Sequence, residues 1–254
     1  MRLRYSTFIL PLIALIGFSP VNAQPAPNGA DLLRSWRSDW ERSMRSVRSL
    51  NYVETASRTI EGPRGHDRFG EVVDVRFSTG RGMDRTVRRR ELNGRRVPAM
   101  RMNALDRRMR QAYGAGFDWV RHPPPMAARL AGIVRPTGGA VADNVGDARA
   151  WRITTAPGQA NDRIERVIFW FARTLSDERP RLLRTRIIGR VPAVARRVQG
   201  GSAVITTDYA RTSGIDLQRS ARAEVVIRQL RRGRVFTVLL NAESTYNAIM
   251  VTPR

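Results

Sequence analysis

From residue 50 onward, apolar side chains recur at every second position, and this period of two restricts most of the chain to β-strands joined by turns. In one such run, Val73, Val75 and Phe77 fall on one face, whereas Asp74 and Arg76 fall on the other. The pair Asn93-Gly94 separates the runs at 85–92 and 95–100, and Gly62-Pro63 separates those at 51–60 and 68–79; both pairs are turn signals. Consecutive runs therefore predict antiparallel hairpins, not strands that alternate with crossover helices.

The runs predict about ten or eleven strands in a mainly β (α+β) domain. Residues 163–174 form the most apolar of these runs. Val167 and Phe169 lie on one face of it, and Ile168 and Trp170 lie on the other. Apolar residues on both faces predict a central strand that is covered on both sides.

The first stretch with the period of an α-helix comes before the strands. It carries one apolar stripe at spacings of three and four residues, and Asp31 or Asn28 is placed to cap its start. The stripe consists of Leu33, Trp36, Trp40, Met44 and Val47. Because a helix with two tryptophans on one face must bury that face, we expect it to lie across the sheet.

A second helical part interrupts the strands in the middle of the chain. Residues 103–113 and 126–134 have short helical patterns, and three consecutive prolines at 123–125 separate them. We expect the whole segment 103–136 to be an insertion, a plug or a lid over the sheet.

Residues 1–23 have the pattern of a secretory signal peptide. Two arginines precede an eleven-residue apolar stretch, and small residues at 21 and 23 precede a cleavage site. Eleven residues are fewer than the roughly 20 that span a bilayer, and the chain has no cysteine that could carry a lipid anchor. We therefore expect an exported, periplasmic protein with a flexible leader at 24–30 and a single domain at 31–254.

The chain is strongly basic, with 45 basic residues, 22 acidic residues and a net charge of +23. Every basic residue is arginine, which is typical of a GC-rich genome and weakens the charge as evidence for a particular function. Because an exported protein seldom meets nucleic acid, we do not expect a nucleic-acid partner. An anionic envelope component, such as lipid headgroups, suits a basic exported protein better.

The densest basic stretch lies at a predicted strand edge. The residues of this basic patch are Arg88, Arg89, Arg90, Arg95 and Arg96. One interpretation is that the patch binds an anionic partner. The other is that its arginines form the hydrated face of an edge strand, where charge blocks strand-to-strand aggregation.

The sequence shows no recognisable catalytic or metal-binding set. The two histidines, His66 and His122, have no partners at metal-ligand spacing, and there is no Gly-x-Ser-x-Gly motif. Four carboxylates could in principle supply a pair for glycoside hydrolysis, although on such strands carboxylates more often pair with arginine. They are Glu54, Glu61, Glu71 and Asp74. We therefore expect no metal, no other cofactor and no enzymatic activity.

The order of elements and three short patterns resemble the LolA-like superfamily, which includes the periplasmic outer-membrane lipoprotein carriers and the envelope regulator RseB. The patterns are residues 50–55 (LNYVET), 90–97 (RELNGRRV) and 204–214 (VITTDYARTSG). The resemblance implies an incomplete antiparallel β-barrel wrapped around helices, with an apolar cavity that holds acyl chains. The chain departs from a simple carrier in its greater length, its Pro-rich central segment and its basic charge.

The resemblance and the apolar residues together predict a monomeric, non-enzymatic periplasmic carrier or chaperone for lipid or lipoprotein acyl chains. The expected cavity lining comes from the first helix and from inward-facing strand residues. It consists of Trp36, Trp40, Met44, Val73, Phe77, Phe169 and Phe171. The alternative is an RseB-like regulatory module that binds a membrane-anchored partner, and a carboxylate-dependent hydrolase is a third hypothesis.

Overall fold

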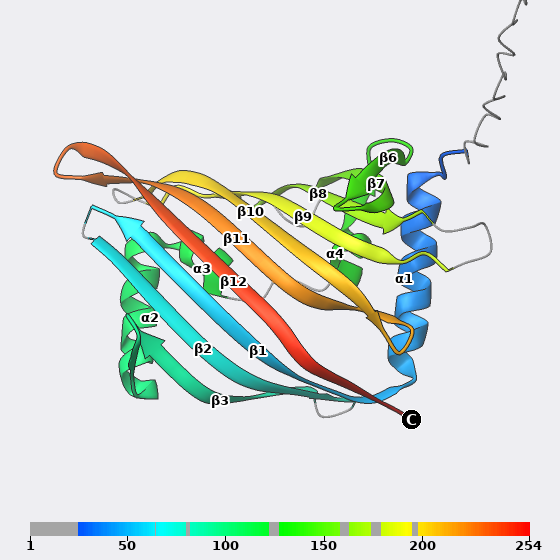
Figure 1. Cartoon of the computed structure of the whole chain (residues 1–254). Helices are drawn as coiled ribbons and strands as arrows, with labels where there is room; N and C mark the ends of the chain where they lie inside the picture. The colour runs from blue at the N-terminus through cyan, green and yellow to red at the C-terminus, as the bar shows by residue number, and fades with distance from the viewer. Residues whose placement is uncertain are drawn as a thin grey trace, which may run out of the picture.

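The computed structural model places twelve strands in one antiparallel sheet, with four helices, over the residues that it describes (Figure 1). Those residues are 25–63, 65–79, 82–121, 127–157, 163–173, 179–194 and 198–254. The predicted signal peptide, residues 1–23, lies outside them. The mainly β fold is confirmed, and the strand count is twelve rather than ten or eleven.

The strands follow one another along the chain almost entirely as hairpins. Their bounds are β1 (Val47–Gly62), β2 (Gly65–Ser78), β3 (Gly82–Leu92), β4 (Arg95–Arg96), β5 (Val134–Pro136), β6 (Val141–Val145), β7 (Ala148–Pro157), β8 (Ile164–Ala172), β9 (Leu182–Val191), β10 (Val198–Thr212), β11 (Ile215–Arg231) and β12 (Arg234–Pro253). Several predicted strands are longer than expected. For example, the sequence has two separate runs, at 235–243 and 246–251, and both belong to the single strand β12.

The sheet is open. Its strand order is β4-β3-β2-β1-β12-β11-β10-β9-β8-β7-β5, with β6 paired to β7 outside this path. The first and last strands of the chain, β1 and β12, pair in its middle over the register from Val47–Pro253 to Glu61–Leu239. Because β4 and β5 end the path without pairing to each other, the fold is an incomplete barrel, as the resemblance implies.

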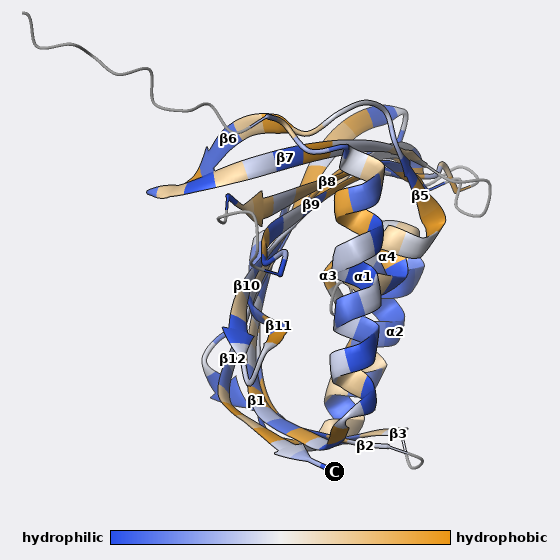
Figure 2. Cartoon of the chain, turned by 90° about the vertical axis from the view of Figure 1, so that its right-hand side faces the viewer, coloured by the Kyte–Doolittle hydropathy of each residue, from blue (hydrophilic) through white to orange (hydrophobic). Residues whose placement is uncertain are grey.

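The sheet curls around the helices, which lie in its concavity (Figure 2). The helices are α1 (Gly29–Arg45), α2 (Ala99–Tyr113), α3 (Ala115–Arg121) and α4 (Ala127–Ile133). Phe117 of α3 and Leu130 of α4 are buried in the main core. Of the three possibilities for the central segment, an insertion, a plug or a lid, this placement is that of a plug.

The concave face carries the core because only that face is covered by helices. Along β8, Val167, Phe169 and Phe171 are fully buried, whereas Ile168 and Trp170 are only half-buried. The prediction that this strand is covered on both sides was therefore wrong for its outer face. No helix lies there among the described residues, and the Trp170 indole instead donates a hydrogen bond to the Asp143 carboxylate of β6, at 2.9 Å.

Helix α1 begins and ends at identifiable signals. The Asn28 side chain caps its start by accepting hydrogen bonds from the backbone amides of Ala30 and Asp31, at 2.9 and 3.4 Å, so the cap is Asn28 and not Asp31. The helix ends at Arg45, and Val47 begins β1. The last residue of the predicted apolar stripe is therefore a strand residue.

The hairpin between β3 and β4 has the predicted turn but a shorter second strand. Asn93 and Gly94 have φ values of 50° and 79°, as a type I′ turn requires. The strand expected at 95–100 stops at Arg96, because Pro98 has no amide hydrogen for a strand ladder and stands instead at the start of α2. Helix α2 consequently begins at Ala99 rather than at 103.

Candidate functional site

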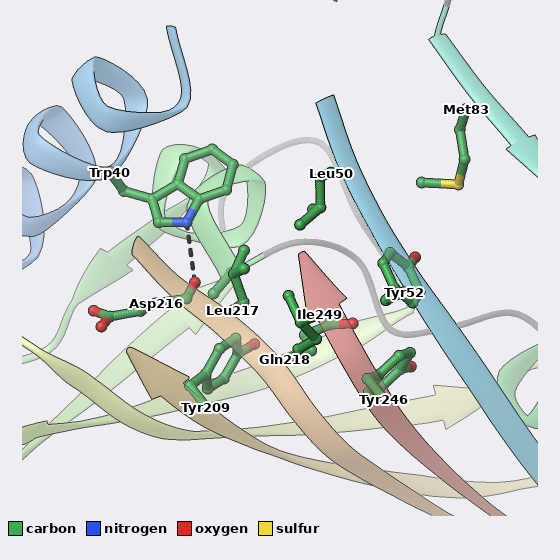
Figure 3. A pocket seen from close by; sticks show the side chains of 11 residues that line it. Trp40, Leu50, Tyr52, Met83, Tyr209, Asp216, Leu217, Gln218, Tyr246 and Ile249 are labelled. Atoms are coloured by element: carbon green, nitrogen blue, oxygen red, sulfur yellow. Dashed lines mark hydrogen bonds between the residues drawn. The ribbon is translucent and has the colours of Figure 1, made fainter. Parts of the chain in front are cut away.

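An apolar pocket of about 120 Å³ lies between α1 and the concave face of the sheet (Figure 3). Its walls come from α1, α4 and strands β1, β3, β10, β11 and β12, which are far apart in the sequence. The lining residues are Trp40, Leu50, Tyr52, Met83, Ala127, Tyr209, Asp216, Leu217, Gln218, Tyr246 and Ile249.

Part of the pocket wall belongs to a small core cluster, whereas the lining residues Ala127 and Tyr209 belong to the main core. Leu50 and Leu217 are buried in this cluster, and Trp40 and Ile249 pack against it while half-buried. Met83 of the edge strand β3 is 53% exposed, so it lies at the rim of the pocket. Apolar side chains that are neither fully packed nor fully hydrated are suited to contact an apolar ligand.

The carboxylate of Asp216 anchors α1 to the sheet. Its side chain is 1% exposed. Its Oδ2 atom accepts hydrogen bonds from the Trp36 indole at 2.9 Å and from the Leu182 amide at 2.8 Å. Its Oδ1 atom accepts from the Arg211 guanidinium at 2.9 Å. The carboxylate therefore has the paired charge and the hydrogen bonds that a buried ion needs.

The second tryptophan of α1, Trp40, contacts the backbone of Asp216. The Trp40 indole donates to the Asp216 carbonyl oxygen at 3.2 Å, as the dashed line in Figure 3 marks. The two indole groups of α1 thus contact the first residues of β11, one in the buried core and one at the pocket wall. These contacts hold α1 over the pocket and satisfy both indole N–H groups.

Three tyrosines are among the lining residues of the pocket. Tyr52 and Tyr246 meet edge to face with ring centroids 5.7 Å apart. Burial raises the pKa of Tyr209 to about 12 and raises the pKa values of Tyr246 and Tyr52, with the nearby Glu54 carboxylate as a further cause for the latter two. All three phenols are therefore neutral near neutral pH.

The sequence-predicted cavity residues divide into two groups in the structure. Trp40 lines the pocket, and Met44 and Phe77 pack against the same small cluster. The other four are buried and do not line the pocket. Trp36, Phe169 and Phe171 lie in the main core, whereas Val73 belongs to neither cluster.

The tyrosines, Gln218 and Asp216 are lining residues that the sequence reasoning missed. One signal was present for Asp216, because this lone acidic residue stands between Ile215 and Leu217. A charged residue inside an apolar run on a strand is a candidate for a buried, paired ion. Nothing in the sequence, however, indicates that its partners are a tryptophan 180 positions away and an arginine across the hairpin.

The basic patch is mostly neutralised by neighbouring acids. Its ion pairs are Arg88–Asp74, Arg89–Glu91 and Arg90–Glu71. Arg95 and Arg96 are exposed, and neither forms an ion pair with another described residue. The structure thus gives three of the five arginines a local structural role at the sheet edge and leaves two directed to solvent.

The carboxylates considered for hydrolysis are also paired. Arg85 Nη2 lies 2.8 Å from the Glu54 carboxylate, and the same kind of pairing holds for Glu71 and Asp74, as given above. Glu61 lies 3.5 Å from His66. Within the described part of the chain, no three acidic or histidine side chains are grouped as a metal site would need.

No family model and no curated protein matches the chain. Among solved structures it is similar to a proposed outer membrane lipoprotein-sorting protein domain from Vibrio parahaemolyticus, with a TM-score of 0.38 and 10% identity over 88% of this chain and 92% of that one. It is also similar to a DUF1329 family protein from Desulfovibrio piger, with a TM-score of 0.34 and 10% identity over 87% and 92%.

A third similar structure is lipovitellin, solved in a study of its lipid–protein interactions, with a TM-score of 0.35 and 7% identity over 82% of this chain and 26% of that one. The first of these structures is of the kind that the sequence resembles. All three TM-scores are below 0.5, so the fold described above depends on the chain's own sheet and not on them. Among the described helices, none is both long and apolar enough to cross a membrane.

Replacing Asp216 with alanine should strongly destabilise the protein. The change leaves Arg211 without its partner and removes the acceptor for Trp36, so we expect the free energy of unfolding to fall by about 3 kcal/mol. Urea denaturation followed by circular dichroism measures this. The matched control is Asp208→Ala, because the Asp208–Arg184 pair is more than one-third exposed and should contribute at most about 1 kcal/mol. Equal losses in the two variants would contradict the anchoring role.

The buried phenols should make the folded state less stable at alkaline pH. The pKa of Tyr209 rises from 10.0 to about 12 on folding. Between these values the unfolded chain releases a proton that the folded chain retains, so the free energy of unfolding falls as pH rises, by up to about 1.4 kcal/mol per pH unit for each such phenol. Below pH 10 the effect should vanish.

Urea titrations from pH 9 to pH 12, with phenolate absorbance of the folded protein as a second readout, test this expectation. Tyr209→Phe should reduce the fall in the free energy of unfolding per pH unit. Tyr113→Phe on α2 is the control and should leave that fall unchanged. If Tyr209 ionised in the folded protein near pH 10, Tyr209→Phe would also leave that fall unchanged and the assigned environment of Tyr209 would be incorrect.

Proposed function

We propose that this protein is a non-enzymatic carrier that binds an alkyl segment of a lipid or lipoprotein acyl chain in the pocket beneath α1. The observation that supports the proposal is the pocket itself, whose lining is apolar apart from neutral hydroxyl groups, one amide and one fully paired carboxylate. Burying an alkyl segment there gains about 25 cal/mol for each Å² of apolar surface removed from water. This binding energy does not depend on the direction of particular contacts, so the pocket would accept different alkyl chains.

The size of the pocket limits what it holds in this conformation. Its volume of about 120 Å³ is similar to the roughly 150 Å³ cavity that admits one benzene molecule. It is smaller than the ~300–1,000 Å³ of pockets that enclose whole small molecules. We propose that the pocket holds the end of one alkyl chain, and that a longer chain enters only when the helices move away from the sheet.

The carrier proposal places the protein's action in the periplasm. A signal peptide at 1–23 would export the chain to the periplasm, where lipids and lipoproteins are available as ligands. Arg95 and Arg96, which are exposed and without ion pairs among the described residues, are the remaining candidates for contact with an anionic envelope component. We propose that the protein acts there as a monomer.

A second candidate function is an RseB-like module that binds a membrane-anchored partner. The observation that favours it is the filling of the concavity, because α3 and α4 bury Phe117, Val120 and Leu130 in the main core. A protein that acts through its outer surface needs no cavity, whereas a carrier does. Ligand uptake by the pocket is therefore the property that separates the two.

Filling the pocket should abolish uptake of an apolar ligand. Leu217→Trp adds a bulky ring to the pocket wall, and we expect the affinity for an environment-sensitive fluorescent fatty amide to fall at least tenfold, or about 1.4 kcal/mol. The matched control is Val226→Trp on the same strand, since Val226 is 38% exposed and does not line the pocket. Fluorescence titration measures both affinities.

Thermal denaturation of both variants shows whether each remains folded. If Leu217→Trp does not fold, Met83→Trp at the exposed rim is the substitute, because that position has room for a larger side chain. Two outcomes would contradict the carrier proposal. One is that both variants bind the ligand as tightly as the original protein does, and the other is that the original protein does not bind it.

A further inference from the structure

The hairpin of β11 and β12 extends beyond the neighbouring strands, at the upper left of Figure 1. On one side, β10 pairs with β11 no further than Gln229, and on the other side β1 pairs with β12 no further than Leu239. Residues 230–238 therefore pair only within the hairpin. We call residues 226–239 the hairpin tip. The Gln229 amide donates a hydrogen bond to the Ala112 carbonyl of α2 at 2.6 Å, which holds the tip against the body of the protein.

The hairpin tip is strongly basic. Its arginines, all of them exposed, are Arg228, Arg231, Arg232 and Arg234. No acidic residue occurs from 225 to 242, and none of the four arginines forms an ion pair with another described residue. Nearer the base of the same two strands, by contrast, Arg222 pairs with Glu243 at 2.8 Å. The positive charge of the tip therefore has no counter-charge on the described part of the chain.

The arginines of the tip lower the stability of the hairpin that carries them. Arg231 and Arg234 stand directly opposite each other in the strand register, where like charges destabilise a sheet. Arg232 and Gly233 have φ values of 49° and 75°, which is nearly the turn of Asn93-Gly94, but arginine adopts a positive φ less readily than asparagine does. Neither the strand pairing nor the turn explains arginine at these positions.

Apolar side chains lie on the outer face of the tip, between the arginines. Val226 and Leu239 stand opposite each other and are each 38% exposed, and Val235 is 55% exposed. The alternate residues Ile227 and Val238 are buried, so the three exposed side chains share one face. Basic and apolar groups together on one projecting surface suit the boundary between water and lipid, because binding there gains from both buried apolar area and attraction to anionic lipids.

We propose that the hairpin tip docks the protein on the anionic headgroups of a membrane surface. Its arginines pair with headgroup phosphates, while Val226, Val235 and Leu239 leave water among the headgroups. A lipid surface suits the tip better than an acidic protein segment does, because it offers negative charge and apolar area together. This inference rests on the periplasmic place of action proposed above and not on the pocket, and it gives a carrier a way to approach a membrane.

Co-sedimentation with vesicles tests the docking surface. The full-length mature protein is mixed with vesicles of phosphatidylcholine alone, or of an equal mixture of phosphatidylcholine and phosphatidylglycerol. We expect at least tenfold tighter binding to the mixed vesicles at low salt. The preference should nearly vanish when the salt is raised from about 0.1 M to about 1 M, because the Debye length then falls from about 10 Å to about 3 Å.

A triple variant locates the binding charge. Each arginine near an anionic surface contributes about fivefold to binding, so we expect Arg231→Gln/Arg232→Gln/Arg234→Gln to bind the mixed vesicles at least tenfold more weakly. The matched control removes the same charge from exposed positions on β7, β8 and β9 that have no ion pair with a described residue, and should bind nearly as tightly as the original protein. It is Arg149→Gln/Arg166→Gln/Arg186→Gln.

A second variant tests the apolar part of the surface. Val235→Ser should weaken binding to the mixed vesicles several-fold without a change of charge. Its control is Val141→Ser on β6, where the valine is 52% exposed, and this change should have no effect. All the replaced side chains are exposed, and thermal denaturation of each variant shows that it remains folded.

Three results would overturn the inference. Equal losses in the two arginine variants would assign the binding to net charge, and equal binding of the original protein to both kinds of vesicle, or to neither, would remove the anionic lipid as the partner. If soluble polyglutamate binds as tightly as the mixed vesicles and Val235→Ser changes nothing, the tip binds acidic chains instead. Uptake of the fluorescent fatty amide separates this inference from the carrier proposal, because a protein that takes up the amide but ignores vesicles remains a carrier without this docking surface.

Discussion

The buried carboxylate of Asp216 is the interaction on which the arrangement of the helix, the sheet and the pocket depends. It joins the Trp36 indole of α1 to Leu182 of β9 and to Arg211 of β10. An ion with a 1% exposed side chain is stable only with such partners. The backbone carbonyl of Asp216 also accepts a hydrogen bond from the Trp40 indole, and this contact holds α1 over the pocket.

The concave face of the sheet has two parts with different chemistry. Strands β7 to β11 bring fully buried apolar side chains such as Phe169 and Ile227 to the helices. Strands β1 to β3 add ion pairs to buried apolar residues such as Ile60 and Phe69, because Arg58 and Arg90 both contact the Glu71 carboxylate, and Arg58 also donates to the Val120 carbonyl of α3 at 3.0 Å. The pocket is lined from both parts, by residues such as Leu50 of β1 and Leu217 of β11.

Periodicity in the sequence predicted the hairpins, the faces of β2, the turn at Asn93 and the burial of the first helix, because each depends on neighbouring residues. The errors have physical reasons. Pro98 ends β4 through its missing amide hydrogen, and the outer face of β8 is uncovered because all four described helices lie on the inner side. The pocket could not be predicted in detail, since its lining residues are far apart in the sequence and meet only in the folded sheet. Asp216 and Trp36 are the clearest case, for their contact spans 180 positions.

The central claim is that an alkyl chain occupies the space beneath α1. Mass spectrometry of lipids extracted from protein purified from the periplasm tests it most directly, with the Leu217→Trp variant prepared in parallel. We predict that the original protein carries acyl lipids and that the variant carries far less. Extracts without lipid from both proteins, or with the same lipid from both, would contradict the claim.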